Sequence, residues 1–224
     1  METTYFYGPG TCALGGIIAL EWLGAPYRLC RIDRETRRSS LYRRVHPQAK
    51  VPALQAAGRT LIENGAILTH LAERKPGLLP PHGTAGRDAA NAWLFYLSSG
   101  LHAAYFPYFT PQRYAPYESL HPLIKETAMG RVRQELAYVD EAVGRYGYLT
   151  GPSKNLCDAY MFGMVRWAKF VDLPREYPRL AAWKERMESD PAVPFALATE
   201  REEKATSPSG AYGGHVTLGS LFSG

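Results

Sequence analysis

The stretch that decides the fold is residues 7–16, YGPGTCALGG, which joins an aromatic run to a helix signal. The run before it, TTYFY at 3–7, is rich in the β-branched and aromatic residues typical of strands. The segment after it, IIALEWLG, carries apolar residues at helical spacing. Gly and Pro at positions 8–10 mark a turn between the two. The pattern predicts a strand, a turn and a helix over 12–23, with Cys12 where the helix begins.

The next part of the chain alternates between strand and helix signals. Residues 27–33, YRLCRID, alternate like a half-buried strand, and short runs over 51–55 and 60–62 flank a turn like the arms of a hairpin. A helix over 64–73 follows, with Asn64 as its N-cap. The order is βαβ and then ββα, which predicts a complete small α/β unit.

The chain changes character after a Pro- and Gly-rich segment at 75–83, KPGLLPPHG, which is typical of a linker. Helical periodicity marks four later segments, with no convincing strand among them: 87–105, 119–146, 155–170 and 178–189. We therefore expect an α/β domain, a linker, an all-helical domain and a Gly/Ser-rich tail, in that order over 1–76, 77–85, 86–204 and 205–224. We expect the tail to be irregular or poorly ordered, with a lid over a site as the alternative.

Composition places this chain of 224 residues among soluble globular proteins. Hydrophobic residues make up 46% and charged residues 21%, which is ordinary for that class. No apolar stretch reaches the roughly 18 residues of a membrane span, and the N-terminus lacks the pattern of a signal peptide. Three cysteines make no disulfide framework and suit a reducing compartment. We expect a cytoplasmic protein that does not bind a membrane.

The net charge of +5 is mild and is no signature of nucleic-acid binding. The densest basic stretch lies within residues 34–44. It is interpreted either as a solvated loop or as a local anion site for a small carboxylate ligand. No His/Cys cluster has zinc-ligand spacing, so we expect no metal.

Cys12 differs from the other two cysteines because of its place. An unpaired cysteine is usually a small buried hydrophobe, and Cys30 and Cys157 fit that description. At a helix N-terminus, however, backbone amides and the helix dipole stabilise a thiolate and often lower the thiol pKa. The local sequence leaves a reactive and an inert Cys12 equally open. No second cysteine stands at C-x-x-C spacing, so a disulfide partner would have to come from outside the chain.

A nucleotide-binding alternative starts from residues 8–13, which formally fit G-x-G-x-x-A, with Asp33 near the end of the next strand. Three features count against it. The α/β unit is too short for a doubly wound sheet, its second half is ββα, and Pro9 removes a backbone N–H from the turn. An oxidoreductase therefore stays a minor alternative.

Taken together, these features resemble the glutathione transferases. The shared features are the βαβ–ββα unit with a thiol at its first helix, a Val-Pro pair, a Glu at a helix start and an all-helical second half. The pattern Y-x-P-G-x-C-(A/S)-L near the N-terminus resembles the bacterial beta class in particular. The resemblance covers residues 3 to about 200. It implies a thioredoxin-like α/β N-terminal domain, an all-α C-terminal domain, and a homodimer.

The resemblance also implies glutathione as co-substrate. The residues it implies for binding are Arg37, Lys50, Val51, Pro52, Glu63 and Asn64. A cis bond before Pro52 would turn the Val51 backbone outward, where it can pair with the cysteinyl backbone of glutathione. Glu63 would meet the γ-glutamyl ammonium, and amides at the helix start would hold its carboxylate. The alternative interpretation is that Asn64 is an ordinary N-cap and Glu63 an ordinary surface glutamate. Arg37 falls where the beta class often carries a lysine near the glycine carboxylate, and adjacent arginines are equally available.

The catalytic residues implied are Cys12 and His102, which matches a histidine that the beta class places facing the cysteine. The alternative interpretation is that His102 has no role in a site and only faces solvent or packs against neighbouring side chains. The expected activity is transfer of glutathione to a hydrophobic electrophile, or disulfide exchange, in detoxification. Phe95 and Ala103 depart from residues found in some beta-class members, which leaves a non-catalytic binding or regulatory module as the alternative. Asp158 belongs to a buried box that we interpret as folding machinery.

Overall fold

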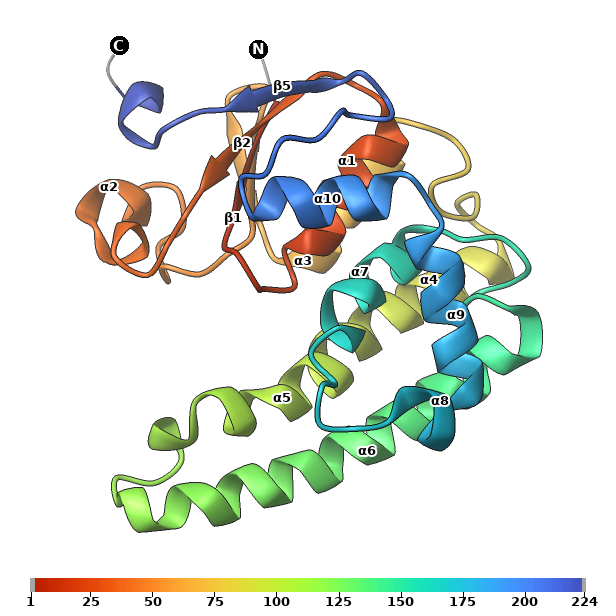
Figure 1. Cartoon of the computed structure of the whole chain (residues 1–224). Coiled ribbons are helices and arrows are strands. Elements are labelled where there is room, and N and C mark those ends of the chain that lie inside the picture. The colour runs from red at the N-terminus through yellow and green to blue at the C-terminus, as the bar shows by residue number, and fades with distance from the viewer. Residues whose placement is uncertain (1–2, 223–224) are drawn as a thin grey trace.

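The computed structural model describes residues 3–222 and has an α/β part followed by a helical part (Figure 1). The α/β part contains strands β1 (Thr3–Tyr7), β2 (Tyr27–Arg31), β3 (Ala53–Ala56) and β4 (Arg59–Ile62), and helices α1 (Leu14–Leu23), α2 (Ser40–Arg43) and α3 (Asn64–Ala72). With β5 (Tyr212–His215) from the end of the chain, the sheet order is β4-β3-β1-β2-β5, with β1 parallel to β2 and antiparallel to β3. The predicted thioredoxin-like arrangement is confirmed.

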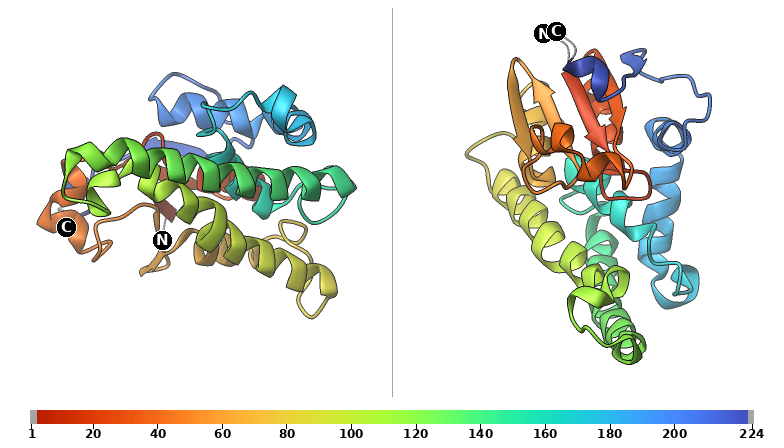
Figure 2. Two further views of the ribbon diagram at one scale, coloured as in Figure 1. Left: turned by 90° about the horizontal axis from the view of Figure 1, so that it is seen from below. Right: turned by 90° about the vertical axis from the view of Figure 1, so that its left-hand side faces the viewer.

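The helical part is built around the long helix α6 and the antiparallel helix α5, which packs against it (Figures 1 and 2). Its helices are α4 (Ala85–Tyr96), α5 (His102–Phe109), α6 (His121–Tyr146), α7 (Leu156–Val165), α8 (Leu173–Glu176), α9 (Pro178–Glu188) and α10 (Ala192–Glu200). A π-helical turn at Leu97–Leu101 joins α4 to α5. The periodicity did not predict α10, and α7 ends five residues earlier than expected. No helix within residues 3–222 has the length and apolarity to cross a bilayer.

Helix α7 begins with a capping box, as its sequence predicts. The Asn155 side chain accepts from the Cys157 N–H at 2.9 Å, and the Asp158 carboxylate accepts from the Asn155 N–H at 3.0 Å. The other Asp158 oxygen accepts from the Leu149 N–H and the Trp183 indole at 3.1 and 3.0 Å. Asp158 is fully buried, and burial raises its pKa to about 6. These bonds are all structural, so Asp158 serves the fold.

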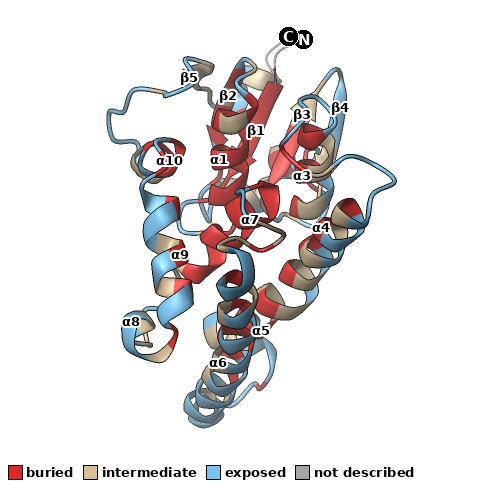
Figure 3. Cartoon of the chain, turned by 90° about the vertical axis from the view of Figure 1, so that its right-hand side faces the viewer, coloured by how far each residue is buried: buried red, intermediate tan, exposed pale blue. Residues whose placement is uncertain are grey.

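Helices α1 and α7 pack closely, and this contact joins the two halves. A Cβ on Gly15 would lie 2.5 Å from the Ala159 carbonyl oxygen, and a Cβ on Gly163 would lie 2.9 Å from the carbonyl oxygen of Cys12. Only glycine allows both approaches without displacing backbone. Figure 3 shows both helices almost wholly buried at the centre of the molecule. The backbone of Cys12 is therefore held directly against the helical half.

Residues 205–222 of the C-terminal tail contain a strand and a short helical turn, which corrects the expectation that the tail is irregular or poorly ordered. Strand β5 (Tyr212–His215) pairs parallel with β2, and a short helical turn η5 (Gly219–Leu221) follows (Figure 1). The Tyr27 N–H donates to the Ala211 carbonyl at 3.0 Å, and the Val216 N–H donates to the Leu29 carbonyl at 2.8 Å. The sequence signal failed because Gly213 and Gly214 weaken strand propensity. The strand forms because the unpaired edge of β2, far earlier in the chain, supplies its hydrogen bonds.

Candidate active site

A cavity of about 160 Å³ lies where the α/β and helical halves meet. Its walls are formed by Cys12, His46, Lys50, Val51, Pro52, Glu63, Asn64, Ser98, His102, Phe106 and Tyr160. All the site residues implied by the sequence are thus brought together except Arg37, which lies in the turn Thr36–Arg38 and does not line the cavity. None of residues 205–222 lines it either, so the interpretation of the tail as a lid gains no support.

The loop before β3 presents a free stretch of main chain to the cavity. The Val51–Pro52 peptide bond is cis. The Tyr42 hydroxyl donates to the Lys50 carbonyl at 2.6 Å and so fixes the residue before Val51. Within residues 3–222, no hydrogen bond is made by the Val51 N–H or C=O. An unpaired extended backbone of this kind can accept another extended chain as a short strand.

The start of α3 offers a second set of free backbone donors. The first backbone hydrogen bond of the helix runs from the Ile67 N–H to the Glu63 carbonyl, so the preceding amides have no helical acceptor. Glu63, not Asn64 as expected, occupies the N-cap position and makes no side-chain cap. Its φ of 70° is a left-handed conformation that is uncommon for a glutamate. Such an outlier points to function, because the surrounding structure must hold it in place.

Asn64 begins α3 and is buried against the Cys12 turn. Its side-chain N–H donates to the Cys12 carbonyl at 3.3 Å, while its Oδ1 is buried with no hydrogen-bond partner in the described chain. A buried acceptor without a partner costs free energy unless a ligand supplies a donor. The site therefore has an acceptor and several amide donors at one end.

Cys12 lies in the turn before α1, two residues before the helix begins at Leu14. Cys12 is only 3% exposed, and burial raises its pKa to about 12, although a backbone hydrogen bond and the Arg166 charge act in the opposite direction. The Cys12 pKa is therefore raised, although the start of a helix favours a lowered thiol pKa. Burial outweighs the amides because a thiolate loses more hydration than they return. At pH 7 Cys12 is a neutral thiol.

His102 is the first residue of α5 and is also neutral at pH 7. Burial and the charge of Lys50 lower its pKa to about 4. Its ring centre lies 4.8 Å from that of Phe106 and 5.6 Å from that of Trp167. A neutral imidazole offers one donor and one acceptor nitrogen. The pocket thus places a thiol and an uncharged imidazole on its walls.

Three wall residues were not anticipated from the sequence: His46, Ser98 and Tyr160. Ser98 lies four residues before His102, so helical spacing could have placed it on the same face. His46 lies shortly before the Val51–Pro52 pair in the chain, and its Nδ1 is buried without a hydrogen-bond partner among the described residues. Tyr160 faces the site through the α1–α7 packing, which no local pattern shows.

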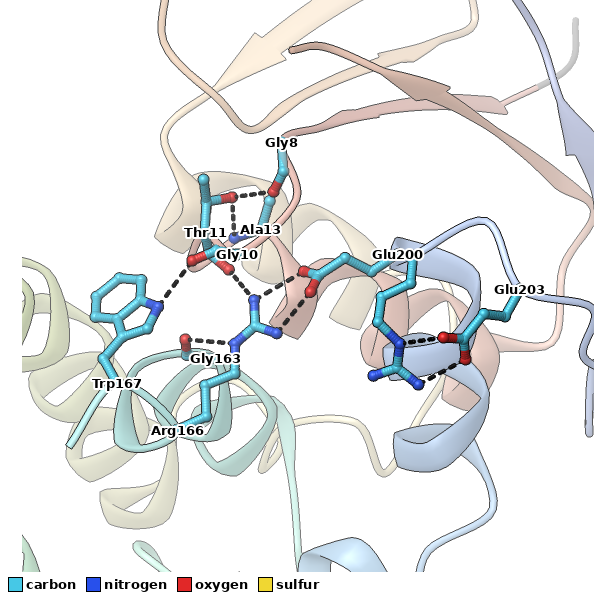
Figure 4. A network of polar contacts seen from close by, with 10 residues as sticks. Gly8, Gly10, Thr11, Ala13, Gly163, Arg166, Trp167, Glu200 and Glu203 are labelled. Carbon is cyan, nitrogen blue, oxygen red and sulfur yellow. Dashed lines mark hydrogen bonds and ion pairs between the residues drawn. The ribbon is translucent and has the colours of Figure 1, made fainter. Parts of the chain in front are cut away.

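Polar contacts from α7 and α10 hold the loop that carries Cys12 (Figure 4). Arg166 donates to the Thr11 carbonyl at 2.8 Å and makes two hydrogen bonds of 2.7 Å to the Glu200 carboxylate. The Trp167 indole donates to the Gly10 carbonyl at 2.9 Å. The side chains of Arg166 and Glu200 are only 15% and 6% exposed. This network fixes the site loop from the helical half.

Comparison with known proteins agrees with this geometry. The family profile of the glutathione S-transferase N-terminal domain matches residues 16–80, and that of the C-terminal domain matches residues 97–191. Glutathione S-transferase GstA of Escherichia coli O157:H7 is 33% identical over 202 residues, which cover 87% of this chain and 97% of that protein.

Solved structures show the same likeness. A bacterial beta class glutathione S-transferase of Sphingomonas chungbukensis is 33% identical, with a TM-score of 0.77 over 88% of this chain and 98% of its own. A sphingomonad glutathione S-transferase complexed with glutathione is 32% identical, with a TM-score of 0.79 over the same shares of the two chains. The chain belongs to the glutathione S-transferase family.

Proposed function

We propose that this chain binds glutathione in extended form in the Cys12 cavity and transfers it to a hydrophobic electrophile. The observation that carries the proposal is the unpaired Val51 main chain beside the cavity. A cysteinyl residue of glutathione can pair its own N–H and C=O with this backbone, as a strand adds to a sheet edge. The sequence pattern of the family and its glutathione-bound relative support the same ligand.

The γ-glutamyl end of glutathione fits the start of α3. Its carboxylate would accept from the free amides at the helix N-terminus, where the helix dipole also favours negative charge. Its ammonium would meet the Glu63 carboxylate and the unpaired Oδ1 of Asn64. Lys50 lines the cavity and Arg37 does not, so Lys50 is the cation we propose for the glycine carboxylate. Arg37 then contributes at longer range.

The chemistry we propose uses the glutathione sulfur as the nucleophile. The Cys12 thiol has a pKa of about 12, so it acts as a hydrogen-bond donor to the glutathione thiolate and not as the attacking group. The glutathione S–H bond breaks and its proton leaves to solvent, because His102, with a pKa of about 4, is too weak a base to keep it. The thiolate then forms a C–S bond with the electrophile, whose leaving group departs with the electron pair. His102 offers a hydrogen bond to thiolate or leaving group.

The electrophile would lie against Phe106, which lines the cavity and is 41% exposed. An apolar electrophile such as an aryl halide suits this wall. Neither Phe95 nor Ala103 lines the cavity, so these two departures do not argue for lost ligand contacts. Disulfide exchange at Cys12 is disfavoured, because it requires a Cys12 thiolate.

We also propose a homodimer that works in the cytoplasm in detoxification. Large aromatic side chains on the outer faces of α4 and α6 are exposed, among them Phe95 at 76%, Tyr138 at 52% and Tyr146 at 63%. Exposed apolar groups of this size support an interface with a second copy. Light scattering coupled to size-exclusion chromatography would give the mass in solution, and a monomer would contradict this part of the proposal.

Titration calorimetry with glutathione tests the ligand, with Glu63→Gln at the start of α3 as the variant and Glu73→Gln, at the opposite end of the same helix, as the control. Glu63→Gln keeps the shape but removes the charge opposite the ammonium. We expect about a tenfold or greater loss of affinity for Glu63→Gln and none for Glu73→Gln. Turnover of an aryl halide by the wild-type chain would show the transfer. No binding at millimolar glutathione would overturn the proposal.

A further inference from the structure

The C-terminal segment, residues 205–222, packs against a small apolar cluster on the α/β part. It lies beyond both family profiles, which end at residues 80 and 191. The Cys30 cluster consists of the buried residues Phe6, Cys30, Ile32, Tyr42, Val45, Ala53 and Leu218, and Leu41, Val51, Ile62, Val216, Leu221 and Phe222 pack against it. The tail therefore supplies one of its buried members and three of its partly buried ones.

The Cys30 cluster connects the tail to the loop that carries Val51. Tyr42 and Val45 belong to α2 and the turn after it, and Val51 itself packs on the cluster. The guanidinium of Arg44 lies 4.7 Å from the ring centre of Phe222. Figure 1 shows η5 and α2 at the same end of the sheet. Tail side chains thus cover the segment that leads into the proposed glutathione site.

That segment has few other restraints. Helix α2 has four residues, and no strand pairs with the chain between β2 and β3. Ala49 has a φ of 54°, which is unfavourable for alanine. Two side chains of α2 bond to the loop: Arg43, exposed, donates to the Pro47 carbonyl at 3.4 Å, and the Tyr42 hydroxyl donates to the Lys50 carbonyl next to Val51. Tyr42 is fully buried in the Cys30 cluster. The position of Val51 therefore depends on side-chain packing, part of which comes from the tail.

We propose that the C-terminal segment is a positioning element that sets the affinity for glutathione. By packing on the Cys30 cluster it keeps Tyr42 on the Lys50 carbonyl, so that the Val51 main chain is already in its binding conformation. Without this packing, only a fraction of the molecules would hold Val51 in the conformation that binds glutathione. The apparent Kd for glutathione would then equal the intrinsic Kd divided by that fraction. Cys12 and His102 lie on other elements, so kcat is not expected to change. The proposal rests on the proposed function.

The test uses point variants of the full chain. Leu218→Ala with Phe222→Ala removes the tail's packing on the Cys30 cluster, and Leu218→Met is the conservative variant. Met187→Ala, in the fully buried core of α9, is the control for lost stability at a distance from the cluster. Calorimetry gives the Kd for glutathione, steady-state kinetics separate KM from kcat, and mass spectrometry after alkylation reports whether Cys30, which is fully buried, becomes accessible.

We expect the double variant to raise the Kd and KM for glutathione about fivefold, with kcat within twofold and with faster Cys30 alkylation. Leu218→Met and Met187→Ala should keep the wild-type Kd. Should the double variant fail to fold, Tyr42→Phe removes the hydroxyl alone and is expected to raise the Kd in the same way. Variants that open Cys30 but bind glutathione like the wild type would overturn this inference alone. A wild-type chain that does not bind glutathione would overturn the proposed function as well.

Discussion

Replacing Arg166 by methionine removes the group that ties the Cys12 loop to α7 and α10. The guanidinium makes two hydrogen bonds to the Glu200 carboxylate and a third to the Thr11 carbonyl. Methionine keeps much of the side-chain volume but supplies no donor. The variant leaves the Glu200 carboxylate, 6% exposed, without its cation.

The size of the effect follows from burial. Removing one partner of a buried ion pair costs about 3–5 kcal/mol, and because Arg166 is partly exposed we expect about 3 kcal/mol. For a chain of this length, a loss of about 3 kcal/mol lowers Tm by roughly 6–12 °C. The loop would also lose its anchor, so the Cys12 thiol should become easier to alkylate.

A matched control is the ion pair of Arg201 with Glu203, which Figure 4 labels. Arg201 also makes two hydrogen bonds of 2.7 Å to its carboxylate partner, but the side chains of this pair are 54% and 53% exposed. An exposed pair contributes about 0–1 kcal/mol, so Arg201→Met should barely change Tm. Thermal and urea unfolding of both variants, with Glu200→Gln and the Arg166→Met/Glu200→Gln double variant, give the coupling between the two side chains.

Equal Tm values for Arg166→Met and Arg201→Met would show that burial does not decide the strength of the ion pair, which would contradict the prediction. A double variant whose loss of stability equals the sum of the losses in the two single variants would contradict it too, since Arg166 and Glu200 would then act independently.

Three further predictions concern the site. Gly163→Ala places a methyl 2.9 Å from the Cys12 carbonyl and should destabilise by about 1–3 kcal/mol in urea unfolding, whereas Gly130→Ala in α6, with no atom within 4 Å, should be neutral or stabilising. At pH 7.5, burial that raises the Cys12 pKa from 9.0 to about 12 should make alkylation of Cys12 roughly 1,000-fold slower than that of an ordinary thiol, and a rate plateau near pH 7 would contradict this. The His102 ring signal, assigned in NMR spectra by its loss in His102→Gln, should titrate near pH 4. Between pH 6.5 and pH 4 the unfolded chain binds this proton more readily than the folded chain, so His102 lowers the free energy of unfolding as the pH falls. A titration midpoint above pH 6 would contradict this prediction.

The fold was predictable because its signals are local. Helical periodicity, the Gly-Pro-Gly turn and the Asn155 capping motif each act within a few residues, so they survive without tertiary context. Strand β5 has no such signal, because its stability comes from the free edge of β2 and its own residues include two glycines. Helix α10 is apolar on most faces, and a buried helix of this kind lacks the amphipathic pattern.

Most of the residues that line the cavity could be named from the sequence, but the electrostatics of the cavity could not. The order of Cys12, Val51 and Glu63 along the α/β unit brings them to one cavity, as the family pattern implies. The Cys12 pKa could not be read from the sequence, because burial by α7 outweighs the helix N-terminus. The wall residue Tyr160 and the Arg166 anchor come from the same α1–α7 packing, which depends on two glycines far apart in the chain.

A crystal structure of the chain with glutathione bound would show the proposed binding mode itself. We expect the cysteinyl N–H and C=O to pair with Val51, the γ-glutamyl end to lie on the first amides of α3, and the sulfurs of glutathione and Cys12 to be neighbours. Glutathione bound elsewhere, or a Val51 main chain that stays unpaired in the complex, would contradict it.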